Sequence, residues 1–331
     1  MKNINGKNID YKEVLSRLGP LLALVLVSIV LSIVTEEFMT LGNITNIMRQ
    51  ASINSLIAAG MMMVILTGGI DLSVGSITAF AACVMGVMLK GGITNPVLLI
   101  VSGFGAGTFV GYINGILLTK LRLPHPFIST IGTRNIFRGL ALLITAASPI
   151  SGFPASVQYP GTGSIFMGIP VSFILVIAVY IAIHIFLNKT ALGRHIYAVG
   201  GNKEAARLSG LNVNKVLIIV YSICGFMCAF ASLVMIGRLN TAFPLAGGTA
   251  DMDAIASCII GGVSFLGGKG TIWGTLIGSL LITVLRNGLN LIGASADMQL
   301  VVIGLVIVIA VYVDVLRASA EAKSKRLAAK K

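Results

Sequence analysis

Residues 188–215, NKTALGRHIYAVGGNKEAARLSGLNVNK, form the longest polar interruption in an otherwise apolar sequence. Long hydrophobic runs lie on both sides of this stretch. Its basic residues outnumber its single acid, Glu204, and they are Lys189, Arg194, Lys203, Arg207 and Lys215. A basic polar stretch between two apolar runs is typical of a cytoplasmic loop in a membrane protein.

The middle of this loop contains a short amphipathic pattern, EAARLSGL, at residues 204–211. Ala205, Leu208 and Leu211 would share one helical face, with the charged side chains turned away. Gly210 is placed to end the helix. Such a helix, with its apolar side toward the membrane, can dock into a partner's cleft. The alternative is a solvated loop whose charge only marks the cytoplasmic side.

The composition excludes a soluble domain. Of the 331 residues 56% are hydrophobic and 11% charged, and the mean hydropathy is +0.96. So few polar side chains cannot cover the outside of a soluble protein. We therefore expect an all-α polytopic membrane protein with about ten transmembrane helices. The predicted spans are residues 20–34, 51–67, 74–90, 96–119, 127–147, 169–187, 216–236, 254–265, 272–292 and 300–313.

Two further segments give local predictions. The fourth span contains Gly103, Gly105, Gly107, Gly111 and Gly115, and small residues at these spacings let helices pack closely. Residues 148–168 contain three prolines and several glycines, so they are expected to form an outer loop.

The net charge of +13 has to be interpreted through the positions of the basic residues along the chain. These positions mark one side of a membrane, so nucleic acid is not an expected partner. With ten spans, most Lys and Arg residues fall on one side, at both ends of the chain and in the central loop. Both termini are therefore predicted to be cytoplasmic. The organisation is an N-terminal segment (1–19), a membrane domain (20–314) containing the cytoplasmic loop 188–215, and a basic tail (315–331).

Two glycine-interrupted segments lie between apolar runs, TGGIDLSVGS at 67–76 and GGVSFLGGKGTIWGT at 261–275. Membrane proteins tolerate such breaks where protein or a water-filled path satisfies the backbone. Asp71, followed by Ser73, is either a residue of such a path or the cap of the next helix. The second segment lacks the spacing of a phosphate-binding loop, so it is not expected to bind ATP.

Three arginines fall inside predicted spans, at a cost of roughly 2.5–3.5 kcal/mol each at mid-membrane. Arg134 lies near enough to a span end to extend to the cytosol. Arg138 and Arg286 are deeper, and Asn287 and Asn290 follow Arg286. Guanidinium and amide groups can hold a sugar, and hydrogen bonds between helices are the alternative. The candidate substrate-path residues are Asp71, Ser73, Arg138, Arg286, Asn287 and Asn290.

Residue types that carry chemistry are sparse. The four cysteines lie in apolar runs without ligand-spaced partners, so packing roles are expected. The three histidines are scattered, and Asp251 and Asp253 begin a span, where helix capping explains them. No catalytic set, metal site or cofactor site is predicted.

Four ordered motifs resemble a known family: TGGIDLSVGS from residue 67, LGRHIYAVGGNKEAARLSGLNVNK from 192, DAIASCIIGGVSFLGGKGTIWGTLIG from 253, and RNGLNLIG from 286. Over residues 38–314 the chain is similar to the permease subunits of bacterial ABC importers for ribose and related monosaccharides. The resemblance implies a multi-pass protein of the bacterial cytoplasmic (inner) membrane that is not itself an enzyme.

The resemblance also implies partners: a second copy of the chain, an ABC ATPase that uses ATP and magnesium, a periplasmic or lipid-anchored sugar-binding protein, and membrane lipid. It makes the central loop the element that couples to the ATPase. The residues that carry this role are Gly193, Arg194, Gly200, Gly201, Asn202, Glu204, Arg207, Leu208, Gly210 and Asn214. Residues 124–154 differ from the ribose permeases, notably at Arg134 and Asn135, so D-ribose is a first choice among monosaccharides.

Two other functions are considered. An ion-coupled secondary sugar transporter would need a carboxylate in the membrane, for which Asp71 is the candidate. An integral membrane enzyme would need a clustered set of His, Cys or carboxylate residues, and the sequence offers none.

Overall fold

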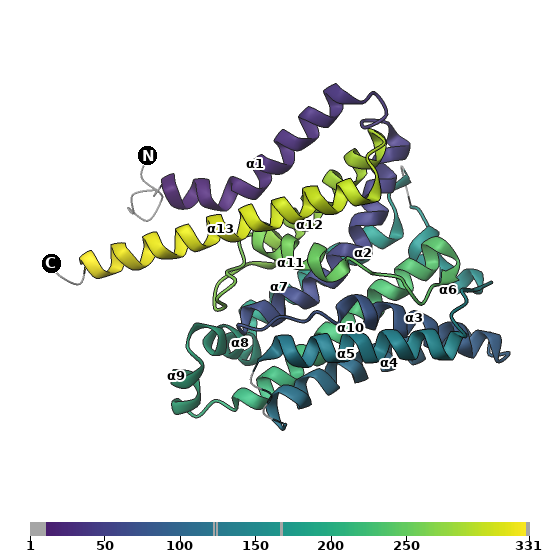
Figure 1. The fold of residues 1–331 in the computed structure, drawn as a ribbon, viewed down its shortest axis with the longest axis horizontal. Helices are drawn as coiled ribbons and strands as arrows, with labels where there is room; N and C mark the ends of the chain where they lie inside the picture. Colours follow the sequence, from purple (N-terminus) through teal and green to yellow (C-terminus); the bar gives the residue numbers. More distant parts are fainter. Residues whose placement is uncertain (1–10, 122, 124, 166–167, 329–331) are drawn as a thin grey trace.

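The computed structural model describes residues 11–121, 123, 125–165 and 168–328, with side chains from residue 19 to residue 316 within these ranges. The described chain is mostly helical (Figure 1). The elements are α1 Tyr11–Val34, α2 Leu41–Leu66, α3 Val74–Lys90, α4 Pro96–Thr119, α5 Pro126–Thr145, β1 Ile150–Ser151, α6 Ala155–Thr162, α7 Val171–Lys189, α8 Ala191–Gly201, α9 Lys203–Leu208, α10 Val213–Leu239, β2 Thr241–Ala242, α11 Ala250–Ile260, α12 Ile272–Leu291 and α13 Ala296–Ala328.

Each predicted span overlaps one helix: α1 to α5, α7 and α10 to α13. Among the described residues, six of these helices (α2, α4, α7, α10, α12 and α13) are long and apolar enough to cross a membrane. The apolar part of α1 and the whole of α3 are shorter. The chain is thus a helical membrane protein, while the count of ten spans stays a prediction.

α11 is a short helix that starts inside the bundle. Its 11 residues rise about 16 Å, roughly half the 30 Å of a bilayer core. The glycine-rich loop 261–271 follows it and returns the chain to α12. The predicted span 254–265 is therefore shifted, since the helix begins at Ala250 and ends at Ile260.

α2 and α10 form the centre of the bundle, and α13 lies almost entirely on its outside. α10 packs along α4 at close range because glycines line the contact. A Cβ at Gly107 would lie 2.7 Å from the Cβ of Ala229 and 2.7 Å from the carbonyl oxygen of Gly225. Gly111 and Gly115 are equally enclosed by α10. The predicted packing role of these glycines is confirmed, but Gly105 faces open space on the other side of α4.

The predicted outer loop 148–168 contains regular structure that the sequence did not indicate. Its β1 pairs with β2, with Ile150 opposite Ala242, and α6 follows despite Pro160 inside it. The pairing ties the segment after α5 to the segment after α10. All four cysteines are buried and free, as expected for packing residues.

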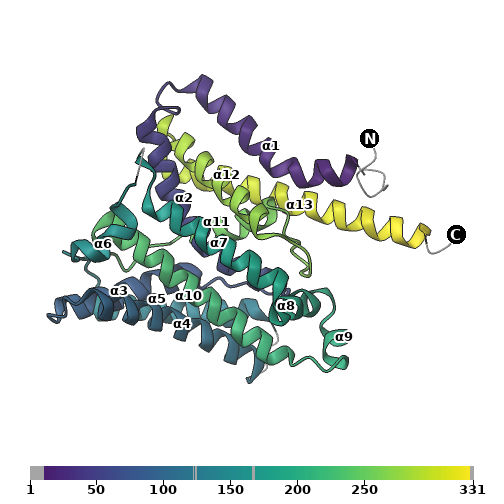
Figure 2. The ribbon, with the colours of Figure 1, turned by 180° about the vertical axis from the view of Figure 1, so that it is seen from behind.

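The start of α1, the end of α13 and the pair α8 and α9 lie at the same end of the molecule in both views (Figures 1 and 2). This arrangement agrees with the predicted topology, in which the two termini and the central loop share one side of the membrane. That this side is the cytosol stays a prediction. The polar segment expected before the first span is helical from Tyr11.

Candidate functional site

A group of three arginines surrounds the beginning of α11. Arg134 and Arg138 come from α5, and Arg286 comes from α12. Together they hold the loop 243–249 and the first turn of α11. We call these three residues, with Asp251 and Asp253, the arginine cluster.

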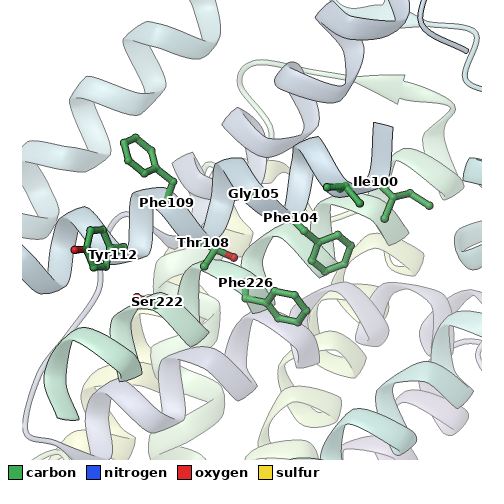
Figure 3. Close-up of a pocket in the computed structure, with 9 residues that line it drawn as sticks. Ile100, Phe104, Gly105, Thr108, Phe109, Tyr112, Ser222 and Phe226 are labelled. Atoms are coloured by element: carbon green, nitrogen blue, oxygen red, sulfur yellow. The ribbon is translucent and has the colours of Figure 1, made fainter. Parts of the chain in front are cut away.

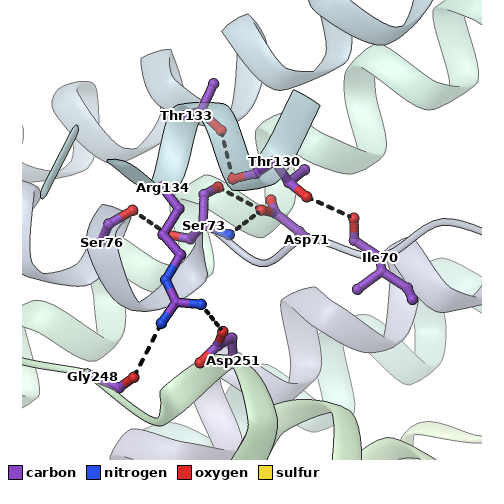
Figure 4. Close-up of polar contacts among 9 residues, drawn as sticks. All are labelled: Ile70, Asp71, Ser73, Ser76, Thr130, Thr133, Arg134, Gly248 and Asp251. Atoms are coloured by element: carbon purple, nitrogen blue, oxygen red, sulfur yellow. Dashed lines mark hydrogen bonds and ion pairs between the residues drawn. The ribbon is translucent and has the colours of Figure 1, made fainter. Parts of the chain in front are cut away.

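Arg134 forms an ion pair with Asp251, with 2.8 Å between Nη1 and Oδ2 (Figure 4). Asp251 is buried, and the Arg134 side chain is 34% exposed. The prediction that Arg134 extends to the cytosol is therefore wrong. The guanidinium turns inward because a carboxylate 117 residues away in the chain neutralises it inside the bundle.

The other two arginines are also engaged within the chain. Arg286 Nη2 lies 2.7 Å from Asp253 Oδ1 and donates to the Thr249 hydroxyl at 3.2 Å. Arg138 Nη1 donates to the carbonyl oxygens of Pro244 and Ala246, both at 2.7 Å. Asp251 and Asp253 were explained as helix caps, but the structure makes them partners of arginines. The sequence did contain a signal for these pairs: three arginines inside predicted spans, each of which needs a neutralising partner in the membrane.

Asp71 lies fully buried in the break between α2 and α3. Its Oδ1 accepts hydrogen bonds from the Ser73 amide, at 2.9 Å, and from the Ser73 hydroxyl. The Asn114 amide of α4 donates to Asp71 Oδ2 at 3.3 Å and to Ser73 Oγ at 2.8 Å. These bonds stabilise the turn that leads into α3, but Asp71 is not the cap of that helix, since Ser73 occupies the N-cap position and its side chain makes no capping hydrogen bond. Sequence reasoning missed Asn114, because only the glycines of its helix were interpreted.

The Asp71 turn adjoins the arginine cluster. Gly75, in the first turn of α3, packs on Gly247 so closely that a Cβ there would overlap the Gly247 carbonyl. Thr130 of α5 donates to the Ile70 carbonyl at 3.4 Å, one residue before Asp71. Figure 4 shows the Asp71 turn together with two members of the arginine cluster, Arg134 and Asp251. The structure therefore brings Asp71, Ser73, Arg138 and Arg286 into one region.

Asn287 and Asn290 do not join this region. Asn287 exchanges two amide hydrogen bonds with Asn43 of α2, at 2.8 and 3.0 Å. Asn290 accepts from Gln299 of α13 at 2.7 Å. Both side chains thus connect helices, which is the alternative that the sequence left open.

The coupling residues implied by the resemblance lie in α8 and α9 and around them. Gly193, Arg194, Gly200 and Gly201 belong to α8, Asn202 stands between the helices, Glu204, Arg207 and Leu208 belong to α9, and Gly210 and Asn214 follow it. Asn202 Oδ1 accepts from the Ala205 amide at 2.9 Å and so caps α9. Gly210 has a φ of 82° after the helix ends, as predicted.

The apolar face predicted for α9 is wrong. Ala206 is the buried side chain of this helix, whereas Ala205 is exposed and Leu208 is 78% exposed. The Asn202 cap and the hydrogen bond from the Leu211 amide to the Ala206 carbonyl (3.1 Å) fix this rotation of a six-residue helix. α9 therefore presents Leu208 and the Glu204–Arg207 ion pair (3.0 Å) outward.

α8 is joined to the bundle where three backbone segments meet: 66–68 at the end of α2, 200–201 at the end of α8, and 267–268 in the loop before α12. We call this contact the glycine junction. The Gly268 amide donates to the Leu66 carbonyl at 2.9 Å. A Cβ at Gly200 would overlap that carbonyl and lie 2.6 Å from the Gly268 nitrogen. Side chains are excluded, so the backbones touch directly.

Tyr197 adds a hydrogen bond beside the glycine junction. Its hydroxyl donates to the Gly270 carbonyl at 2.9 Å. Burial raises the pKa of the Tyr197 phenol, because the charged form loses solvation. The phenol therefore stays protonated and remains a donor.

The outer face of α4 and α10 carries an open hollow of about 710 Å³. Figure 3 shows its side chains, with Phe104 and Phe226 side by side and Phe109 and Tyr112 further along α4. The Phe104 and Phe226 ring centroids are 4.7 Å apart. The lining holds hydroxyls but no amide or charged side chain, so it suits lipid chains better than a sugar.

Among the residues that the structure describes, no three His, Cys, Asp or Glu side chains come together as a metal site would require. Many buried polar groups instead form hydrogen bonds between helices, and one end of the bundle carries a basic segment with an exposed helix. Long apolar helices with this arrangement define a multi-pass helical membrane protein.

Comparison with known proteins gives the family. Residues 43–311 match the family described as "Branched-chain amino acid transport system / permease component". The chain belongs to this family of transport permease components, and it is a multi-pass protein of the cytoplasmic (inner) membrane.

Individual relatives are sugar permeases by name. The chain is 45% identical to the ribose import permease protein of Bacillus subtilis (strain 168), over 93% of this chain and 95% of the relative. It is 39% identical to the ribose import permease protein of Escherichia coli (strain K12), over 95% and 98% of the two chains. It is 40% identical to the D-allose transport system permease protein of the same strain, over 88% of each chain.

Proposed function

We propose that this chain is the membrane-spanning permease subunit of an ABC importer that carries a monosaccharide into the cell, with D-ribose the first choice. The observation that carries the proposal is the 45% identity to a ribose import permease protein along nearly the whole chain. Relatives named for allose and fructose are 40% and 37% identical. The 45% identity places ribose first within a group of sugars, although the ribose relative of Escherichia coli (strain K12), at 39%, is level with the allose relative.

The exposed side of α9 supports contact with an ATPase subunit. Leu208 is exposed on α9, and this helix lies at the end of the molecule that carries the start of α1 and the end of α13. An exposed leucine beside an ion pair is a small docking surface of the kind that fits a cleft. ATP and magnesium would be bound by that partner.

The glycine junction supports transmission of movement from α8 into the bundle. α8 touches the end of α2 through backbone atoms, and the Asp71 turn begins directly after α2. A shift of α8 on the ATPase would therefore displace the region around Asp71 and the arginine cluster. Binding of ATP to the partner can shift the balance between the inward-facing and outward-facing states of the permease only if it changes this contact.

The uncovered face of α5 supports assembly with a second copy. Asn135 is exposed midway along this helix, next to Arg134. A bare amide facing lipid is unfavourable, so we expect this face to meet a second copy across a polar path. Asp71, Ser73, Arg138 and Arg286 are engaged within the chain, so in this proposal they shape the path, and an external binding protein selects the sugar.

Radiolabelled ribose uptake into proteoliposomes that contain this chain, its ATPase and its binding protein tests the proposal. Accumulation should require ATP on the ATPase side and should be competed most strongly by unlabelled ribose. Leu208→Asp should leave assembly in the membrane intact but separate ATP hydrolysis from uptake. Absence of uptake of any sugar by an intact complex would reject the importer function.

The same assay distinguishes an ion-coupled transporter. Such a protein would lose uptake when an uncoupler collapses the ion gradient and would keep it when ATP is removed. We expect the reverse, because the Asp71 carboxylate is held by Ser73 and Asn114 and is not left open for an ion.

A further inference from the structure

One side of the first half of α2 carries a line of amide side chains. Asn46, Gln50 and Asn54 follow one another at intervals of four residues, so they share one face over about 12 Å of helix. We call these three residues the amide row. Each of them is partly exposed. The face closes below Asn54, since Ile57 is 2% exposed and residues 58–66 are all buried.

Each amide of the row keeps one hydrogen-bonding group without a partner in the described part of the chain. Asn46 Oδ1 accepts from Arg238 Nη2 at 2.9 Å and from Gln50 Nε2 at 3.4 Å, which leaves the Asn46 amide nitrogen open. Asn54 Nδ2 donates to Ser257 Oγ at 3.2 Å, which leaves its carbonyl oxygen open. Gln50 also keeps its carbonyl oxygen. These three atoms are not buried, so they face accessible space.

The row lies between two other elements of the bundle. Arg238, near the end of α10, holds one end of the row at Asn46, and Ser257 of α11 holds the other end at Asn54. Ser257 Oγ also donates to the carbonyl of Asp253 at 2.6 Å, so this end of the row adjoins the arginine cluster. Open amides are unfavourable against hydrocarbon and face the bundle interior or a water-filled space. We therefore expect water, not lipid, in front of the row.

The groups on this face match a neutral molecule that carries several hydroxyls. The open carbonyl oxygens of Gln50 and Asn54 accept hydroxyl protons, and the open Asn46 nitrogen donates to a hydroxyl oxygen. Ile53 is partly exposed on the same side of the helix and offers an apolar contact to the C–H face of a ring. An anion would be opposed by the two carbonyl oxygens, and a cation would find no carboxylate on the row.

We propose that the amide row is a sugar-binding wall inside this permease, where a neutral monosaccharide places its hydroxyls at Gln50 and Asn54 and its ring at Ile53. The inference rests on the proposed sugar transport and adds a resting site in the membrane to the external binding protein. Because the face closes at Ile57, the sugar would wait on the side away from α8 (Figure 1). The other end of α2 reaches the glycine junction, so a movement there would act on the helix that holds the sugar.

A reporter cysteine tests whether water reaches the row. The four native cysteines are buried, so a charged methanethiosulfonate reagent should leave them unlabelled in the folded chain. In proteoliposomes of the full-length chain with its ATPase, without ATP, Ile53→Cys should be labelled. Two matched positions should stay unlabelled over the same time. Ile57→Cys is buried one turn deeper, and Ile29→Cys is 52% exposed on the apolar part of α1, where it meets lipid.

Ribose should slow the labelling of Ile53→Cys, at concentrations up to about 100 mM because a few hydrogen bonds exchanged with water give weak affinity. Adding Gln50→Leu or Asn54→Leu should raise the protecting concentration roughly 2- to 10-fold. Thr45→Val is the control, because its hydroxyl lies off the row and donates to the Leu41 carbonyl at 2.9 Å. It should leave protection unchanged. Thermal unfolding and the labelling rate without sugar verify that each variant is folded.

Four results would overturn the proposal. An unlabelled Ile53→Cys would mean that lipid or a second copy covers the face. Labelling that no neutral sugar slows would mean that the face is wet but binds no sugar. Unchanged protection in both leucine variants would place the sugar elsewhere, and stronger protection by ribonate than by ribose would assign the face to an anion.

The labelling requires no ATP, so its failure is distinct from failure of the proposed importer. ATP-dependent ribose uptake without protection of Ile53→Cys would reject only the sugar-binding wall. Protection without ATP-dependent uptake would reject only the importer.

Discussion

Alanine at Gly107 should weaken the central contact between α4 and α10. The added Cβ would lie 2.7 Å from the Ala229 Cβ and 2.7 Å from the Gly225 carbonyl oxygen. Ordinary contacts at these positions are about 3.5 Å, so each is short by roughly 0.8 Å. Neither neighbour can rotate away, because one is backbone and the other is a single methyl group. The two helices must separate, at a cost of about 1–3 kcal/mol.

Gly105 is the matched control for this change. It lies two residues earlier on α4, and a Cβ there would meet no atom within 4 Å. Both alanine variants gain the same helix propensity, about 1 kcal/mol. The difference between Gly107→Ala and Gly105→Ala therefore isolates the steric cost. At about 2–4 °C per kcal/mol, Gly107→Ala should melt roughly 2–12 °C below Gly105→Ala.

The assay can use the four buried cysteines, which become reactive only on unfolding. A thiol-reactive dye, added to detergent-solubilised protein during heating, reports the midpoint for both variants and for the unmodified chain. Equal midpoints for Gly107→Ala and Gly105→Ala would refute the close approach of α4 and α10. A lower midpoint for Gly105→Ala would refute the assignment of the open face.

Three further changes test the polar contacts. Arg134→Met leaves the Asp251 carboxylate without its cation and should cost about 3 kcal/mol of stability, which is the low end for a buried pair because Arg134 is 34% exposed. Addition of Asp251→Leu should recover most of this loss, as measured by thermal melting. Asp71→Asn keeps an acceptor for the Ser73 amide, so we expect a loss of about 1–2 kcal/mol with uptake retained, and complete loss of uptake would instead indicate an ion site. Tyr197→Phe removes one hydrogen bond, worth about 0.5–1.5 kcal/mol. Burial raises the pKa of the Tyr197 phenol, so the stability that this side chain contributes is complete below about pH 10 and is lost as the pH rises through the folded-state pKa. Circular-dichroism unfolding at pH 9 and pH 11 should therefore show a smaller alkaline loss in the phenylalanine variant than in the unmodified chain.

Much of the helical layout could be predicted from the sequence, because apolar runs and glycine spacing are local signals. The runs located the long helices, and Gly107, Gly111 and Gly115 indicated a close helix contact that α10 fills. The segment 148–168 was less readable, since its turn residues suggested a loop and α6 forms within it. Its helix is held by packing on α10.

The polar contacts could be predicted only in part, because they join distant residues. Arg134 is neutralised by Asp251, 117 residues later, and no local pattern indicates which acid faces which arginine. The rotation of α9 failed for a different reason. Six residues give too short a period to fix a face, and Asn202 and the turn at Gly210 decide which side is buried.

The glycine junction has a consequence for engineering chimeric transporters. Because segments 66–68, 200–201 and 267–268 touch through backbone, the glycines at 200–201 and 267–268 offer no side chain that can be redesigned to suit a new neighbour. In the proposed importer, exchange of partner recognition would therefore be confined to the outward residues of α9, between Asn202 and Gly210. A crossover placed within 200–201 would instead have to bring all three segments from one parent, since their fit depends on the main-chain path and on glycine at positions 200 and 268.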